Sequence, residues 1–379
     1  MAIYITSNFL YGDNFEVKRG TLIIEDGIIY GITNEHIPIN KNHIKYGGYI
    51  LPPLINCHTH VGDTGIKDIG INKNLDDIVK PPNGLKHRYL SNISDEKLIT
   101  TIYHGIEEIF NGGSSYFCDF RENGLEGIKI LNKSYEKYRH NKGVYPIPIV
   151  LGRPTLKEHN IKVEIKNILN YSHGINLSGC NEYDNDILKY VGKMTKKYNK
   201  LFSIHANEHK GSVKYSLNKY GMTEIERISN LKLNPSFIIH ATHTSENDLD
   251  IIEEQNIPVV VCPRANASFN VGLPNINELF NRTLIGIGTD NIMANSPSIF
   301  REMDFIYKIY HIEPTEILRF ATENGAKILG IPKLGLIKEG YIGKSLTFVS
   351  CNPLRYSKNS IASIITRCEY GDSFILNLQ

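Results

Sequence analysis

Four histidines and one aspartate in this chain could together bind a metal ion. His58 and His60 form an H-x-H pair, and because alternate residues of an extended chain face the same side, both imidazoles can reach one ion. His205, His240 and Asp290 each end another short apolar run. Taken singly, a histidine at the end of a strand is more often a hydrogen-bonded structural residue, and Asp290 could cap a following helix. Their combination favours a shared metal site.

The segments that would position these residues are short strands alternating with helices. Helical segments at 95–110 and 245–255 each follow a serine N-cap, Ser94 and Ser245. No G-x-G-x-x-G follows a strand, which disfavours a dinucleotide-binding sheet. The alternation predicts an α/β fold with a (β/α)8 TIM barrel over residues 49–333. The eight strand candidates are rich in β-branched or aromatic residues and lie at 49–57, 114–120, 145–152, 174–179, 201–205, 236–240, 258–262 and 284–290.

The barrel explains why the five side chains should meet. Enzymes of this fold carry their catalytic groups at the C-terminal ends of the strands. His58 and His60 end the first strand, His205 the fifth, His240 the sixth and Asp290 the eighth. We therefore expect all five to converge on one mouth of the barrel.

The two ends of the chain have a different pattern. Residues 1–48 and 334–379 alternate apolar and polar residues with glycine at the turns, as antiparallel strands do. Because they bracket the barrel, we expect them to pair as one small β-sandwich domain.

The overall composition excludes several classes of protein. A formal net charge of +2 gives no field that would attract nucleic acid or an anionic membrane. The apolar runs are far shorter than the ~20 residues that a membrane span needs, and the N-terminus has no secretory-signal pattern. We expect a cytoplasmic protein. Its six scattered cysteines are expected to be buried small hydrophobes rather than disulfides or metal ligands.

The motifs PPLINCHTHVG, SIHANE, IIHATH, CPRANASFNVG and IGIGTDN resemble those of the amidohydrolase superfamily. They are most similar to its deaminase/chlorohydrolase branch, which includes adenosylhomocysteine, guanine and cytosine deaminases. The resemblance covers nearly the whole chain. By motif, it implies that the metal ligands are His58, His60, His205 and Asp290.

Two catalytic roles also follow from the resemblance. It implies that Glu208 is the proton shuttle and that His240 touches the water or the substrate. By its chemistry as a carboxylate, Asp290 can take the proton of the water. Without the resemblance, Glu208 would be read as a first-turn helix carboxylate, and His209 and His243 are expected at the rim.

The ligand set implied by the resemblance suits one divalent ion. Three imidazoles and one carboxylate suit Zn²⁺ best, with Fe²⁺ or Mn²⁺ as alternatives, and leave a position open for water. A metal lowers the pKa of bound water to about 7, which makes hydroxide available near neutral pH. Binuclear relatives carry a lysine at the end of the fourth strand, whereas this strand reads GINLSGCNEY. We therefore expect a mononuclear site.

Basic residues that follow other strands are candidate substrate contacts. Lys86, His87 and Arg88 lie in a stretch that could bind a carboxylate or phosphate, or could form a solvated turn. Arg121, with Glu122 beside it, follows the second strand, and Arg153 follows the third; both arginines could instead form ion pairs at the barrel rim.

The resulting hypothesis is a metal-dependent aminohydrolase that acts on a small heterocycle. The substrate would be a purine nucleoside, purine, pterin or pyrimidine, and the reaction would release ammonia. The alternatives are a cyclic amide hydrolase or a chlorohydrolase that uses the same site, and a non-catalytic scaffold on the same fold, which would be expected to lose metal ligands. Members of the superfamily often form homo-oligomers, so the resemblance also implies that this chain could form one.

Overall fold

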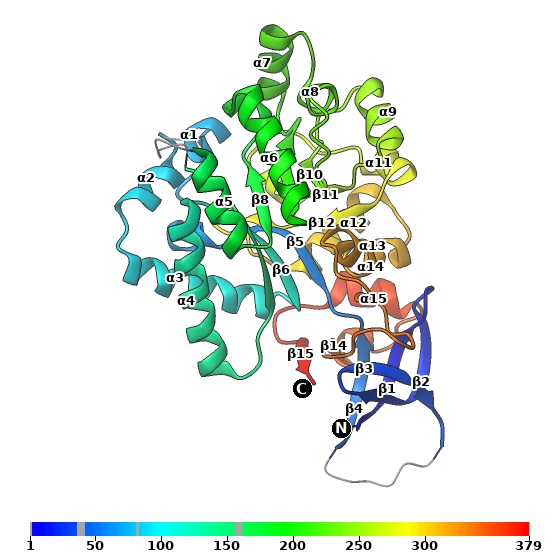
Figure 1. Ribbon diagram of the computed structural model, residues 1–379. Helices are drawn as coiled ribbons and strands as arrows, with labels where there is room; N and C mark the ends of the chain where they lie inside the picture. The colour runs from blue at the N-terminus through cyan, green and yellow to red at the C-terminus, as the bar shows by residue number, and fades with distance from the viewer. Residues whose placement is uncertain (1, 36–41, 81–82, 156–160, 379) are drawn as a thin grey trace.

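The computed structural model describes residues 2–35, 42–80, 83–155 and 161–378. Within these residues the strands form two sheets, one of nine strands and one of six. The nine-stranded sheet comes from the middle of the chain, whereas the six-stranded sheet is built from both ends (Figure 1). The sequence predicts this arrangement, because strands alternate with helices in the middle of the chain and apolar residues alternate with polar ones at both ends.

The larger sheet forms the barrel. Its strands are β5 (Ile55–His60), β6 (Tyr116–Arg121), β7 (Ile147–Gly152), β8 (Gly174–Leu177), β9 (Leu201–Ala206), β10 (Phe237–His240), β11 (Val259–Val261), β12 (Ile285–Ile287) and β13 (Asp290–Asn291). They lie in the order β12-β11-β10-β9-β8-β7-β6-β5-β13, and neighbouring strands are parallel. β12 and β13 stand at opposite ends of this order, yet only Gly288 and Thr289 separate them in the chain. The sheet therefore closes on itself, which confirms the predicted barrel.

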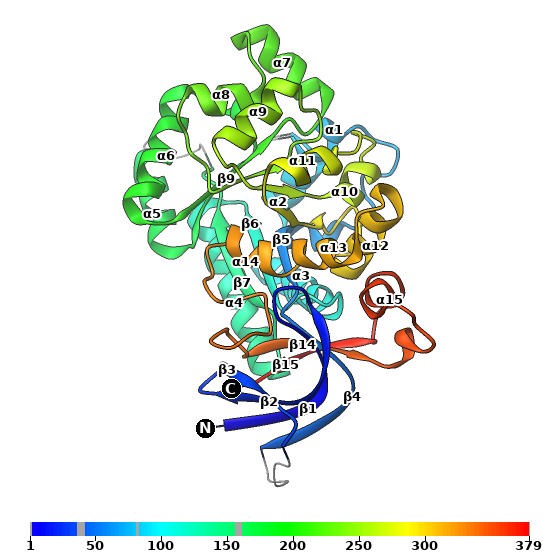
Figure 2. The ribbon, with the colours of Figure 1, turned by 90° about the vertical axis from the view of Figure 1, so that its right-hand side faces the viewer.

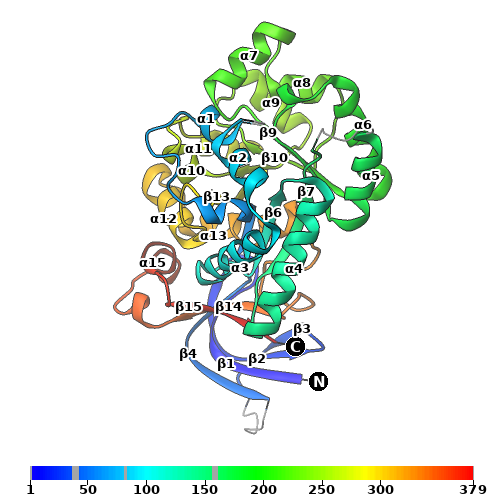
Figure 3. The same cartoon turned by 90° about the vertical axis from the view of Figure 1, so that its left-hand side faces the viewer.

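Helices cover the outside of the barrel, and short ones lie near its mouth. Figure 3 shows α3 and α4 side by side against the barrel. Figure 1 shows α1 and α7, which follow β5 and β9, on the side away from the small sheet. The helices are α1 (Leu75–Val79), α2 (Leu85–Asn92), α3 (Asp95–Asn111), α4 (Gly124–Lys142), α5 (Ile161–Tyr171), α6 (Asn185–Tyr198), α7 (Lys210–Tyr220), α8 (Glu224–Asn230), α9 (Glu246–Glu254), α10 (Pro263–Ser268), α11 (Ile276–Arg282), α12 (Ile299–Tyr310), α13 (Pro314–Phe320), α14 (Glu323–Ile328) and α15 (Ser360–Arg367), with 3-10 turns η1 (Val61–Ile66), η2 (Cys180–Glu182) and η3 (Asn352–Leu354).

Both predicted serine caps are present. The Ser94 hydroxyl accepts a hydrogen bond from the backbone N–H of Lys97 at the start of α3. Ser245 begins α9 as part of a capping box with Asp248, in which each side chain accepts from the other's backbone N–H. These caps satisfy N–H groups that would otherwise have no partner at a helix start.

Two of the predicted barrel strands are divided in the structure. The segment 49–57 contains Pro52 and Pro53, which cannot donate to a sheet, so its first part ends β4 of the small sheet at Leu51 and the barrel strand starts at Ile55. The segment 284–290 breaks after Ile287 at Gly288, where a Cβ atom would lie 2.5 Å from the Cβ of His58. The close approach of these two strands therefore requires glycine.

The small sheet unites the two ends of the chain. Its strands are β1 (Ala2–Tyr11), β2 (Glu16–Glu25), β3 (Ile28–Thr33), β4 (His43–Leu51), β14 (Ser345–Ser350) and β15 (Ser373–Asn377). Their order is β15-β14-β4-β1-β2-β3, so the antiparallel pair of β4 and β14 joins the N-terminal strands to the C-terminal ones. Figure 2 shows this sheet beside the barrel, with α15 next to α12. The predicted pairing of the flanks is confirmed.

All six cysteines are free, as predicted. Five are buried, but Cys351 is exposed, which corrects the expectation that every cysteine is a buried hydrophobe. Among the described residues, no helix is both long and apolar enough to cross a membrane.

Candidate functional site

The four histidines and the aspartate meet at the C-terminal ends of the barrel strands. His58 and His60 lie at the end of β5, His205 near the end of β9, His240 at the end of β10 and Asp290 at the start of β13. All five are buried, with no more than 7% of any residue exposed. Their ligand atoms form two overlapping groups in which every atom lies within 4.8 Å of the others. One group contains His58, His60 and His205, and the other contains His58, His240 and Asp290.

Hydrogen bonds orient the imidazoles toward a common point. The Nδ1 atom of His205 lies 2.9 Å from the carbonyl oxygen of Leu177, and Nδ1 of His60 lies 3.1 Å from that of Phe120. A carbonyl only accepts, so Nδ1 carries the proton in both rings and each Nε2 keeps its lone pair. The Nε2 of His60 is 3.5 Å from Oδ1 of Asp290. Both lone pairs are thus available to a ligand held at the centre.

The backbone is strained at two of these positions. His240 has a φ of 75° and Asp290 a φ of 60°, although neither is glycine. Non-glycine residues adopt this left-handed region at a cost, and such residues often cluster at functional sites. Both residues belong to the same group of candidate metal ligands.

Burial sets the charges of these groups. Burial lowers the pKa of His58 and His205, and it lowers that of His60 to about 3. For Asp290, burial would raise the pKa, but the His58 hydrogen bond and the surrounding histidines hold it below its usual value. The site therefore holds the neutral imidazoles of His58, His60 and His205 around the ionised carboxylate of Asp290.

This donor set fits a divalent metal ion. Neutral imidazole nitrogens and a carboxylate oxygen are the ligands that Zn²⁺ takes, and they also suit Fe²⁺. Nε2 of His58 lies 3.1 Å from Oδ1 of Asp290, within the ligand group, whereas its buried Nδ1 has no hydrogen-bond partner among the described residues. The residues that could hold the ion are His58, His60, His205 and Asp290.

Glu208 and His240 lie beside this group. Oε1 of Glu208 is 3.6 Å from Nε2 of His240, whose Nδ1 is 3.4 Å from the amide nitrogen of Asn266. Burial raises the pKa of Glu208. Its side chain keeps 19% exposure, so it can still reach a bound molecule. The pair can therefore exchange protons with a substrate.

A cavity of about 370 Å³ opens in front of these residues, within the usual range for small-molecule sites. Its wall includes Glu208, His240 and Asp290, and also Glu224, Glu182 and Tyr215. Glu224 accepts hydrogen bonds from the backbone N–H of Asn207 and the hydroxyl of Ser212, and its burial raises its pKa to about 7.

The basic residues singled out from the sequence separate into two groups. Lys86 and Arg153 are buried and line this cavity. His87 instead lies 3.0 Å from the carbonyl of Val79 through Nε2, and Arg88 is exposed and lines another hollow. Arg121 is buried against Glu122, with Nη2 and Oε2 2.6 Å apart. His87, Arg88 and Arg121 are not among the residues that line the cavity.

Sequence reasoning missed several acidic residues near the site. Asp63 accepts from the side chain of Asn291 and the backbone N–H of Met293, which ties the turn after His60 to the segment after Asp290. Glu224 and Glu182 line the cavity although neither follows a barrel strand directly. The one available signal was the position of Asp63, three residues after the H-x-H pair.

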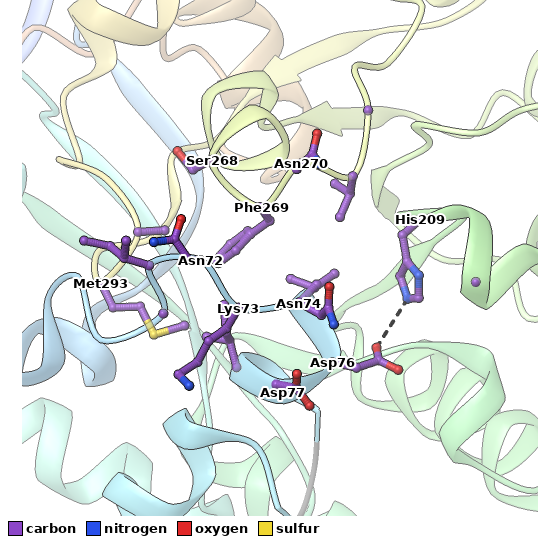
Figure 4. Close-up of a pocket in the computed structure, with 18 of the residues that line it drawn as sticks. Asn72, Lys73, Asn74, Asp76, Asp77, His209, Ser268, Phe269, Asn270 and Met293 are labelled. Atoms are coloured by element: carbon purple, nitrogen blue, oxygen red, sulfur yellow. Dashed lines mark ion pairs between the residues drawn. The ribbon is translucent and has the colours of Figure 1, made fainter.

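A second hollow of about 1240 Å³ adjoins the cavity, and the two share Leu75, Asp76, His209 and Gly211. Figure 4 shows Asp76 and His209 pointing toward each other on one side of this hollow, with Oδ1 and Nε2 3.8 Å apart. His243 also lines this hollow, where its Nε2 lies 2.6 Å from the carbonyl of Val271. Both histidines thus lie outside the ligand group.

Comparison with known families identifies the class of this protein. Residues 49–360 match the model of the amidohydrolase family. The chain belongs to this family and is a hydrolase that acts on carbon–nitrogen bonds.

Two of the similar proteins align with this chain over most of its length and of their own. One is an uncharacterized protein of Methanocaldococcus jannaschii, 54% identical over 98% of this chain and 96% of its own. The other is a 5-methylthioadenosine/S-adenosylhomocysteine deaminase of Pyrococcus furiosus, 27% identical over 88% of this chain and 83% of its own.

Solved structures share the same fold. An adenosine deaminase from Xanthomonas campestris with bound zinc superposes with a TM-score of 0.83 at 16% identity, over 98% of this chain and 90% of its own. The atrazine chlorohydrolase TrzN from Arthrobacter aurescens, complexed with zinc, gives 0.80 at 14% identity, over 98% and 92%. At such low identity the similarity concerns the fold alone.

Proposed function

We propose that this protein is a metal-dependent aminohydrolase that removes an amino group from a small heterocycle and releases ammonia. The observation that carries the proposal is the convergence of His58, His60, His205 and Asp290 beside the Glu208–His240 pair. The substrate class is an amino-substituted purine, purine nucleoside, pterin or pyrimidine. The name of the Pyrococcus furiosus relative supports this choice.

His58, His60, His205 and Asp290 would hold one divalent metal, most simply Zn²⁺. The metal would lower the pKa of a bound water to about 7, which supplies the nucleophile. Asp290 is ionised and can accept the proton of that water. Nε2 of His240 faces Glu208 and can orient the attacking oxygen.

Glu208 would carry the proton that the reaction needs. The attacked ring carbon can accept electrons only when a neighbouring ring nitrogen is protonated, and this requires an acid within hydrogen-bond reach. Burial raises the pKa of Glu208, so its carboxyl group holds a proton more readily near neutral pH. The same carboxylate can then return a proton to the departing amino group.

A single metal ion is supported by the end of β8. The bridging lysine of binuclear relatives would stand there, but the chain continues from Leu177 through Ser178, Gly179 and Cys180. A mononuclear site favours a deaminase over the binuclear amide hydrolases.

The experiment is an assay of ammonia release by zinc-reconstituted protein across aminopurines, their nucleosides, aminopterins and aminopyrimidines. Asp290→Asn serves as the control for contaminating activity. Release that disappears in the control supports the proposal and selects the substrate. If zinc is bound stoichiometrically and no compound releases ammonia, the deaminase proposal fails, and cyclic amides and chlorinated heterocycles become the substrates to assay.

A further inference from the structure

Glu122 is buried directly behind a proposed metal ligand. It follows β6, is 2% exposed and is not part of the cavity wall. Its Oε1 lies 2.9 Å from Nδ1 of His60, on the side of the ring opposite the Nε2 that faces Asp290. Glu122 therefore contacts the imidazole from behind and leaves its ligand nitrogen free.

Two cations hold Glu122 in this place. Nζ of Lys86, from α2, lies 2.5 Å from its Oε1, and Nη2 of Arg121 lies 2.6 Å from its Oε2. Both cations are almost completely buried. A buried carboxylate is tolerated only where charges or hydrogen bonds of this kind compensate for its lost hydration.

The chain makes room for this arrangement at Gly62. A Cβ atom at that position would lie 1.9 Å from Nη2 of Arg121. The turn after His60 thus admits the guanidinium only because residue 62 has no side chain. Nζ of Lys86 also lies 3.3 Å from Oδ2 of Asp63, which belongs to this turn. Lys86 therefore links Asp63, in the segment after β5, to Glu122, in the segment after β6.

We propose that Glu122 is a positioning residue that orients His60 and strengthens it as a metal ligand, and that Lys86 acts through Glu122. An imidazole that binds a metal through one nitrogen commonly donates its other N–H to a carboxylate or carbonyl, which raises its basicity as a ligand. Here His60 Nδ1 has the Phe120 carbonyl at 3.1 Å and the Glu122 carboxylate at 2.9 Å. The inference rests on the metal site of the proposed function.

The test is the zinc affinity of the folded protein, measured by competition with a chromophoric chelator. Glu122→Gln keeps the size of the side chain but removes its charge, and we expect zinc to bind about 10–100-fold more weakly. Glu164→Gln is the matched control, because Glu164 is a buried glutamate that accepts a hydrogen bond from the backbone N–H of Thr155. The zinc affinity of Glu164→Gln should stay within about 2-fold of wild type, a much smaller change than the loss expected for Glu122→Gln.

A second pair of variants tests whether Lys86 acts through Glu122. Lys86→Met should weaken zinc binding less than Glu122→Gln, because Arg121 still holds the carboxylate. The charge-balanced double variant K86M/E122Q should bind zinc as weakly as E122Q alone and no more weakly. It also replaces E122Q in the test if the single variant does not fold.

The outcomes separate this inference from the proposed function. If wild-type protein binds no zinc, the metal site itself is wrong. If wild type binds zinc and the folded Glu122 variants bind it equally well, only the positioning role is overturned. A further loss in K86M/E122Q relative to E122Q would show that Lys86 acts independently of Glu122.

Discussion

Nε2 of His58 lies 3.1 Å from Oδ1 of Asp290, although the two residues are 232 positions apart in the chain. Closure of the barrel creates this contact, because β13 pairs with β5 and brings Asp290 opposite Thr59. Both groups are buried, and the protein holds a carboxylate against three imidazoles in the absence of bulk water. A divalent ion would compensate the buried negative charge of Asp290 and join the first and last strands of the barrel.

We therefore expect metal removal to destabilise the protein. A ligand that binds only the folded state stabilises it by about 2.7 kcal/mol at a concentration 100 times its dissociation constant. Dialysis against a chelator should lower the melting temperature, and added Zn²⁺ should restore it while Mg²⁺, which prefers oxygen ligands, should not. An identical melting temperature with and without Zn²⁺ would instead favour a non-catalytic scaffold.

Glu208→Gln should slow turnover without displacing the metal. Its carboxyl group is 3.6 Å from His240 and is not one of the ligand group, so zinc content should remain that of wild type. Loss of a general acid typically lowers kcat by about 10²–10⁴-fold. Steady-state ammonia release and metal analysis on the same preparation measure both quantities. Glu182→Gln is the control, because Glu182 lines the same cavity but accepts a hydrogen bond from the hydroxyl of Ser178. An equal loss of turnover in Glu182→Gln would contradict a specific catalytic role for Glu208.

Gly288→Ala should disturb the metal site through packing alone. The added Cβ would lie 2.5 Å from the Cβ of His58 and 2.9 Å from Sγ of Cys262, both in the closed barrel. Overpacking of this kind costs about 1–3 kcal/mol, and a displaced His58 should bind zinc more weakly. Urea unfolding and zinc titration measure the two effects. Gly47→Ala, where nothing lies within 4 Å of the new Cβ, should change neither.

The stability of the protein should depend on pH through His87. Burial lowers the pKa of this imidazole from 6.5 to about 4. Its folded pKa lies below its unfolded value, so the unfolded state binds the proton first, and stability is lost as pH falls from about 6.5 toward 4. Wild type should thus lose about 1–2 kcal/mol relative to His87→Gln between pH 7 and pH 5. Urea unfolding of the metal-free proteins at both pH values provides the comparison, and a difference that stays constant would contradict it.

The sequence by itself determined the fold and the identity of the four histidines and the aspartate of the candidate metal site. Alternation of strands and helices is a local property, and the C-terminal ends of parallel strands must share one face. For that reason His58, His205 and Asp290 could be expected together before any contact was known. The pairing of the two flanks was predictable in the same way. In residues 1–48 and 334–379 apolar and polar residues alternate as they do in strands, and both segments lie outside the barrel.

Only the tertiary structure decided which charged groups support the site. Lys86, Glu122 and Asp63 come from separate segments, and their contacts depend on how α2 packs over the turn after His60. No local pattern distinguishes Lys86, whose ammonium is enclosed by two carboxylates, from the exposed Arg88 two residues later. Burial and distance arise only when the chain is folded, and they determine which charges are desolvated, which are paired, and which face the cavity.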